Sequence, residues 1–185
     1  IVDLRTGEAA AAEALTRVAP EAGFAHAGEL FDAAAACGRV FELDLATQRN
    51  ALNAARQWPS RLLLFVNCSP DAVADPRFAE TLLSQVNAVD GLCPSRVTLE
   101  ITERSEQQFV AGLVEQVRVL REAGFQLAID DVGAGASGLN RIMMLRPGWL
   151  KLDRELIDHI DTDITKQNLV RFLGHFTRLS GTRMI

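Results

Sequence analysis

Residues 126–139 read QLAIDDVGAGASGL, an apolar segment that leads into two adjacent aspartates and then into a glycine-rich turn. Residues 126–130 have the length and composition of a buried strand, which ends in Asp130 and Asp131. Three glycines follow in the spacing G-x-G-x-x-G, at positions 133, 135 and 138. That spacing is typical of a dinucleotide-binding fold, whereas paired carboxylates are typical ligands of a divalent metal. The stretch alone leaves both kinds of site open.

Apolar segments of this kind recur along the chain and alternate with helical patterns. The predicted strands are residues 1–4, 12–17, 62–67, 97–101, 126–130, 149–153 and 182–185. The predicted helices are residues 28–36, 44–57, 76–88, 106–123, 139–144 and 164–179. Buried strands separated by helices indicate a parallel sheet with helical crossovers, either doubly wound or closed into a barrel. The interrupted last strand favours an α/β TIM-like (β/α) barrel that is incomplete at its C-terminal end.

Composition indicates one globular domain over residues 1–185. The chain is 48% hydrophobic with a formal net charge of −5, and it has no Lys/Arg cluster, which argues against binding of duplex nucleic acid. Three widely spaced cysteines without a C-x-x-C pattern fit free thiols in a reducing cytoplasm. No apolar run approaches the roughly 20 residues of a membrane-spanning helix, so we expect a cytoplasmic domain whose parent protein can be anchored elsewhere. Because both ends fall in predicted strands, we expect a longer multidomain chain, with the end of a seventh strand and all of an eighth lying outside this sequence.

Several polar residues lie within the apolar predicted strands or at the C-terminal ends of these strands. They are Glu13, Asn67, Glu100, Asp130, Asp131, Lys151 and Asp153. Ligands of parallel α/β folds bind at the C-terminal ends of strands, and a buried charge is costly unless it is paired or bound to a metal. Oxygen ligands without histidine or thiolate favour Mg²⁺ or Mn²⁺.

The adjacent aspartates fit a metal site better than a dinucleotide site. Neighbouring residues within a strand face opposite sides, but the flexible backbone near Gly133 and Gly135 can aim both carboxylates at one mouth. Two such carboxylates can bridge cations about 3.5–4 Å apart. In a dinucleotide fold the pyrophosphate rests on the glycine turn, where Asp130 and Asp131 would repel it. We therefore disfavour the dinucleotide interpretation.

The order of these motifs resembles that of the EAL-domain family, the cyclic di-GMP phosphodiesterases. The matching segments are 13-EAL-15, Asn67, 100-EITE-103, 130-DDVGAG-135 and 151-KLD-153. The resemblance implies a TIM-like barrel that hydrolyses cyclic di-GMP to linear pGpG with two Mg²⁺ or Mn²⁺ ions per site, in bacterial signal transduction. It also implies a homodimer and a covalently linked upstream sensory or GGDEF-type domain.

The resemblance assigns roles residue by residue. The implied metal ligands are Glu13, Asn67, Glu100, Asp130 and Asp131, with Asp130 bridging and Asp131 on the second metal. Glu13 and Lys151 are the implied catalytic residues, and Lys151 orients or deprotonates the attacking water. Arg17 is implied to contact a substrate phosphate. Asp153 shares a strand face with Lys151, so it either holds the lysine or contacts the ligand. Glu103, Gly133 and Gly135 are expected to stabilise the surrounding loops.

The sequence departs from the family pattern in one loop. The family usually reads D-D-F-G-T-G there, and Val132 and Ala134 replace the aromatic residue and the threonine. The family uses this loop at its dimer interface and in regulation, so the substitutions bear on those properties more than on the chemistry. The alternative function is a catalytically inactive EAL domain that acts as a cyclic di-GMP receptor or a scaffold. Inactive members are expected to lose a ligand such as Glu13, and none of the ligands within the sequence is lost, which favours an active enzyme.

Overall fold

The structure is a computed structural model that describes residues 1–102, 112–133 and 138–185. Glu103, Ala134, Gly135 and the first part of the predicted helix 106–123 lie outside the described residues.

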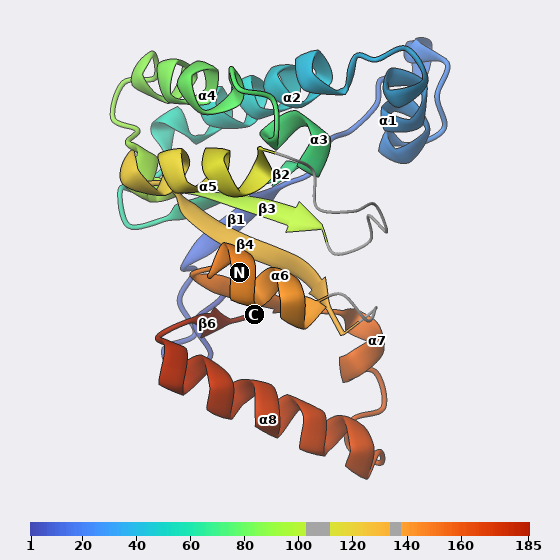
Figure 1. Cartoon of the computed structure of the whole chain (residues 1–185), viewed down its shortest axis with the longest axis vertical. Helices are drawn as coiled ribbons and strands as arrows, with labels where there is room; N and C mark the ends of the chain where they lie inside the picture. Colours follow the sequence, from blue (N-terminus) through green and yellow to red (C-terminus); the bar gives the residue numbers. More distant parts are fainter. Residues whose placement is uncertain (103–111, 134–137) are drawn as a thin grey trace.

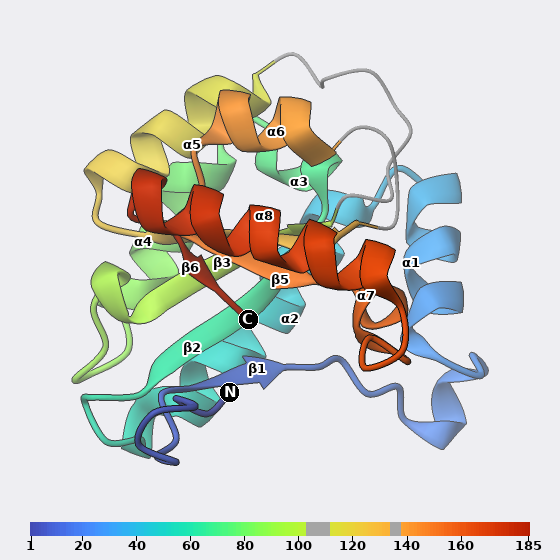
Figure 2. The ribbon, with the colours of Figure 1, turned by 90° about the horizontal axis from the view of Figure 1, so that it is seen from below.

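The described residues form a parallel sheet of six strands in the order β1-β2-β3-β4-β5-β6. The strands are β1 (Ala11–Ala14), β2 (Leu63–Cys68), β3 (Val97–Thr102), β4 (Gln126–Val132), β5 (Trp149–Leu152) and β6 (Arg183–Met184). The sheet curls into a half-barrel, and the two chain termini lie close together in both views (Figures 1 and 2). The predicted α/β class and partial TIM-like barrel are confirmed, because consecutive strands are neighbours joined by helical crossovers.

The two faces of the sheet pack differently. Side chains on the outer face, such as Leu64, Val66 and Ile129, belong to a large apolar core shared with the helices. The inner face carries a smaller cluster of Ala11, Phe65, Ala128 and Trp149. The Phe65 and Trp149 rings meet edge to face with centroids 5.3 Å apart. Because side chains repeat every two residues, positions two residues beyond this cluster face the same interior, nearer the C-terminal ends of the strands.

Eight α-helices are described around the sheet. They are α1 (Ala27–Ala36), α2 (Val40–Ala54), α3 (Pro70–Val73), α4 (Phe78–Asn87), α5 (Leu113–Glu122), α6 (Gly138–Leu145), α7 (Arg154–Ile157) and α8 (Ile164–Ser180). Helix α5 buries Val117 and Leu120, three residues apart, and Gly124 follows its end at φ 100°. Asp163 caps the start of α8 and Gly181, at φ 71°, ends it. None of the described helices is both long and apolar enough to cross a membrane.

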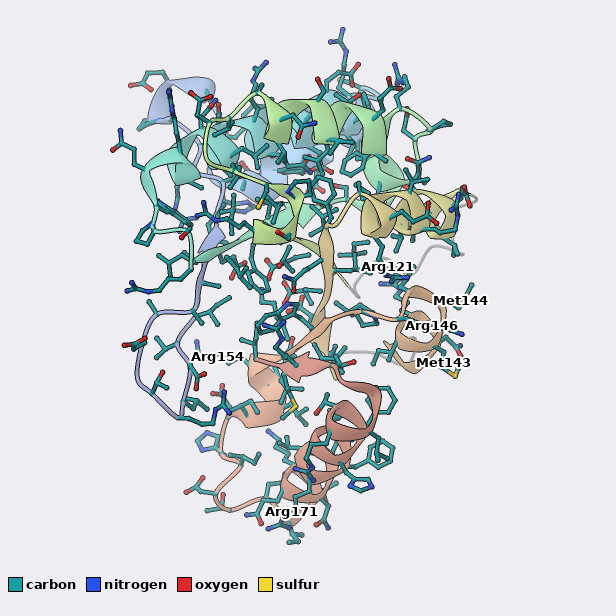
Figure 3. The ribbon with its side chains drawn as sticks, turned by 90° about the vertical axis from the view of Figure 1, so that its left-hand side faces the viewer. Arg121, Met143, Met144, Arg146, Arg154 and Arg171 are labelled. Atoms are coloured by element: carbon teal, nitrogen blue, oxygen red, sulfur yellow. The ribbon has the colours of Figure 1, made fainter. Side chains whose placement is uncertain are left out.

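The position of α1 and a contact between α5 and α6 define the surroundings of the sheet. Helix α1 lies on the side toward which the strands point, at the right of Figures 1 and 2. Arg121 of α5 donates hydrogen bonds to the carbonyls of Leu145 and Arg146 at the end of α6 (Figure 3). Met143 and Met144 of α6 lie exposed beside this contact.

One predicted strand is wrong. Residues 1–4 form no strand, and only an antiparallel bridge joins Val2 to Ala9. The Asp3 carbonyl accepts the N–H groups of Thr6 and Gly7, and Gly7 adopts φ 72°, so the backbone turns here. Leu4 is 98% exposed, which removes the burial that a strand prediction from apolar residues assumes.

Candidate metal and phosphodiester site

Five polar side chains follow the apolar inner cluster toward the C-terminal ends of the strands. They are Glu13 on β1, Asn67 on β2, Glu100 on β3, Asp130 on β4 and Lys151 on β5. Four of them lie two residues beyond a member of the inner cluster, for example Asn67 beyond Phe65 and Lys151 beyond Trp149. Because side chains alternate between the two faces of a strand, residues from five strands meet on the inner face at the C-terminal edge of the sheet, which we call the mouth.

Three carboxylates meet around the ammonium group of Lys151. Oxygen atoms of Glu13, Glu100 and Asp130 lie within 4.8 Å of one another. Lys151 Nζ lies 2.7 Å from Glu100 Oε1, 3.1 Å from Asp130 Oδ1 and 3.3 Å from Glu13 Oε2. Lys151 therefore neutralises part of a negative cluster that would otherwise be costly to bury.

Burial governs the electrostatics of this cluster. Glu100 is 0% exposed, and its burial raises its pKa to about 7, although Lys151 acts in the opposite direction. Burial would lower the pKa of Lys151, but the carboxylates of Glu100, Asp130 and Glu13 together raise it above its ordinary value. The surrounding carboxylates therefore favour the charged form of Lys151, and whether it orients or deprotonates the attacking water stays a prediction.

Asn67 joins the cluster through its side-chain amide. Its Nδ2 donates to Glu13 Oε1 at 3.4 Å and to the carbonyl of Ala14 at 3.5 Å. The amide oxygen is the atom left for a cation, as expected for an oxygen ligand.

The two adjacent aspartates lie within an irregularity of the β4–β5 pairing. The β4–β5 register shifts between Ile129 and Val132, and Asp131 adopts φ 55°. The pair lies inside β4, which continues to Val132, rather than at its end as predicted. The Asp131 N–H donates to Asp130 Oδ1 at 3.0 Å, and the group of carboxylates within 4.8 Å contains Asp130 without Asp131. The proposed second-metal role of Asp131 stays a prediction.

Gly133 follows the bulge in a conformation that favours glycine. Its φ is 109°, and a Cβ added to it would lie 3.2 Å from Leu156 Cδ2. The preceding Val132 is buried in the core shared with the helices. Gly133 thus lies where a side chain would crowd Leu156 of α7.

Arg17 lies at the rim of the site. Its exposed guanidinium donates to the carbonyl of Thr16 at 3.2 Å. It lines a cavity of about 710 Å³ that also reaches Glu13, Asn67, Phe31 and Trp58, between β1, α1 and α2. An exposed arginine next to the carboxylate cluster is available to an anionic ligand, which keeps its phosphate-binding role as a prediction.

Asp153 caps the helix that follows β5. Its side chain accepts a hydrogen bond from the N–H of Glu155 at 2.6 Å and so caps the N-terminus of α7. Strand β5 ends at the preceding residue, Leu152. Its own N–H donates to the carbonyl of Val132. Capping explains why this side chain is buried, and its contact with substrate stays a prediction.

The residues present suit a divalent cation. Glu100 Oε2 is buried without a hydrogen-bond partner among the described residues, beside two further carboxylates and an amide. Hard oxygen donors of this kind are the ligands of Mg²⁺ and Mn²⁺. The donor set therefore fits the metal expected from the sequence.

The sequence interpretation missed two buried polar residues behind β2. Asp44 and Gln48 of α2 are each 1% exposed. They stand four residues apart, on the face that also buries Leu45 and Leu52. Polar residues within an apolar helical stripe are the signal that could have revealed them.

The comparisons with known proteins agree with this geometry. The EAL domain family matches residues 1–185. The chain belongs to the EAL domain family. The strands and the carboxylates described above are therefore those of an EAL domain.

Three relatives of this EAL domain illustrate the range of the family. BlrP1 of Klebsiella pneumoniae, solved in complexes of cyclic di-GMP with calcium and with manganese, is 31% identical with a TM-score of 0.85, over 97% of this chain and 45% of that chain. The probable cyclic di-GMP phosphodiesterase PdeI of Escherichia coli K12 is 29% identical over 86% of this chain and 21% of its own length. The blue light- and temperature-regulated antirepressor BluF of Escherichia coli K12 is 26% identical over 72% of this chain and 34% of its own. This EAL domain spans less than half of each relative.

Proposed function

We propose that this domain hydrolyses one phosphodiester of cyclic di-GMP to give linear pGpG. The observation that carries the proposal is the meeting of three carboxylates, an amide and a lysine from five strands at one mouth. The complexes of BlrP1 with cyclic di-GMP and a divalent cation support the choice of substrate and of metal.

The residues divide into three roles. Glu13, Asn67, Glu100 and Asp130 would hold one Mg²⁺ or Mn²⁺ ion, and Asp130 with Asp131 would hold the second. Metal ions bound there would lower the pKa of a water molecule and neutralise negative charge at phosphorus. Lys151 directs its positive charge toward the attacked phosphate and the water, and Arg17 binds a phosphate oxygen from the rim.

A direct assay tests the proposal. Cyclic di-GMP is incubated with the purified chain and either Mg²⁺ or Mn²⁺, and pGpG is followed by chromatography. We expect cleavage that EDTA abolishes and that is lost in Glu13→Ala, with Glu21→Ala on the exposed turn before α1 as the matched control. Absence of metal-dependent cleavage by the wild-type chain would overturn the proposal.

The second candidate is a domain that binds cyclic di-GMP or a protein partner without cleavage. The observation that favours it is the likeness to BluF, an EAL relative named as an antirepressor. Micromolar binding of cyclic di-GMP without turnover would identify a receptor. Neither binding nor turnover would identify a scaffold. We propose that a homodimer and a linked sensory or GGDEF-type domain accompany the function in either case.

A further inference from the structure

Helix α2 directs two buried polar side chains at the end of β2. Asp44 and Gln48 lie one helical turn apart, and each is 1% exposed. Gln48 also lines the cavity that reaches Glu13 and Asn67. Neither side chain belongs to the carboxylate cluster around Lys151.

The Asp44 carboxylate hydrogen-bonds to the backbone immediately after β2. Its Oδ2 accepts the N–H of Ser69 at 2.7 Å. A buried carboxylate is less favourable to stability than an apolar side chain of similar size, so packing alone does not explain an aspartate here. Its one described role is to hold the segment that follows Asn67 and Cys68.

Gln48 contacts the same segment one turn further along the helix. Its Nε2 lies 3.4 Å from the carbonyl oxygen of Asn67 and 3.3 Å from Cys68 Sγ. Its Oε1 is buried and has no hydrogen-bond partner among the described residues.

The end of β2 needs this support because its pairing is one-sided. The β1–β2 register ends at Ala14↔Val66, whereas β2 pairs with β3 as far as Cys68↔Ile101. Asn67 therefore lies beyond its last partner on β1. Its carboxamide nevertheless turns into the cluster and reaches Glu13.

We propose that Asp44 and Gln48 are positioning residues that fix the backbone at residues 67–69 and thereby aim the Asn67 carboxamide into the metal site. The proposal rests on the proposed function for the metal site itself. Removing a group that hydrogen-bonds to a metal ligand and orients it typically weakens metal affinity by about 10- to 100-fold.

Manganese binding by the purified chain tests the proposal, with the paramagnetic resonance signal of free Mn²⁺ as the readout. We expect Asp44→Ala to weaken Mn²⁺ affinity by about tenfold, and Gln48→Ala to weaken it less, because its contacts are longer. Asp44→Asn keeps the acceptor for Ser69 and should restore the affinity. Leu52→Ala is the matched control, since Leu52 is buried on the same helix and its truncation lowers stability without removing a hydrogen bond to residues 67–69.

The variants also separate positioning from stability. Wild-type affinity in Asp44→Ala, or an equal loss in Leu52→Ala at the same melting temperature, would overturn the proposal. The side-chain NH₂ resonances of Asn67 give a second readout in metal-free protein, and Asp44→Ala but not Leu52→Ala should shift them. Unshifted resonances in Asp44→Ala would likewise overturn it. Failure of the proposed function would appear separately, as wild-type protein that does not cleave cyclic di-GMP.

Discussion

The ammonium nitrogen of Lys151 lies 2.7 Å from Oε1 of Glu100, a carboxylate with no exposed surface. The same nitrogen contacts Asp130 and Glu13, so a single cation stands among three carboxylates. A divalent ion at this mouth would meet the same oxygen atoms. Lys151 and a metal would therefore contact the same carboxylates. Variants of Lys151 and of Glu100 should reveal this shared dependence.

Replacing Lys151 with methionine should destabilise the metal-free protein and abolish turnover. Removing one partner of a buried ion pair costs about 3–5 kcal/mol, and here it leaves three carboxylates together. Mn²⁺ should recover much of that loss, because the cation replaces the missing charge. Thermal unfolding in EDTA and in Mn²⁺ measures both effects, and a Lys151→Met melting temperature equal to that of wild type in EDTA would contradict the ion-pair account.

Adding Mg²⁺ or Mn²⁺ should raise the unfolding temperature of the wild-type chain, and Glu100→Gln should remove most of that rise. A ligand at 100 times its Kd stabilises the folded state by about 2.7 kcal/mol. The glutamine keeps the shape of the side chain but loses the charge that attracts the cation. The exposed Glu21→Ala variant serves as control and should respond to metal as wild type does. An undiminished metal response in Glu100→Gln would exclude Glu100 as a ligand.

The free energy of unfolding should depend on pH through Asp44. Burial raises the pKa of this carboxyl from 3.8 to about 6, against the hydrogen bonds from Ser69. Between these two values the unfolded chain has lost the proton and the folded chain has kept it, so the stability that Asp44 contributes falls as the pH rises through this window. Relative to Asp44→Asn, the wild type should lose about 2.4 kcal/mol from pH 4 to pH 7.

Urea unfolding of both proteins in EDTA at several pH values measures this difference. The comparison cancels the other titrating groups, which the two proteins share. A constant difference across the range would show that Asp44 titrates alike in the folded and unfolded states.

Substituting Gly133 with alanine should destabilise the domain more than substituting Gly7 does. Both glycines have positive φ, so each substitution incurs backbone strain of about 1–2 kcal/mol. Only at Gly133 does the new Cβ also meet a side chain, Leu156 Cδ2 at 3.2 Å, whereas Gly7 faces open space. Chemical denaturation of the two variants checks this order, and equal losses would mean that Leu156 moves aside without cost.

Much of the fold and of the site could be predicted from the sequence. Runs such as 62–67 and 126–130 have the apolar composition of buried strands, and the structure confirms strands there. The motif order led to Glu13, Asn67, Glu100, Asp130 and Lys151, which the fold brings together. The prediction at residues 1–4 is wrong because a run of four residues with only three apolar ones does not establish burial, and Leu4 is exposed.

The sequence by itself determined the α/β class and the polar residues of the site, because the alternation of strand and helix patterns and the order of the motifs can be read along the chain. Only the tertiary structure decided that Lys151 lies among the carboxylates, that Asp130 and Asp131 lie in an irregular part of β4, and that Asp153 caps a helix. It also decided that Asp44 and Gln48 of α2 support β2 from behind. Contacts between side chains depend on how strands and helices pack across long sequence separations, and local patterns do not encode that packing.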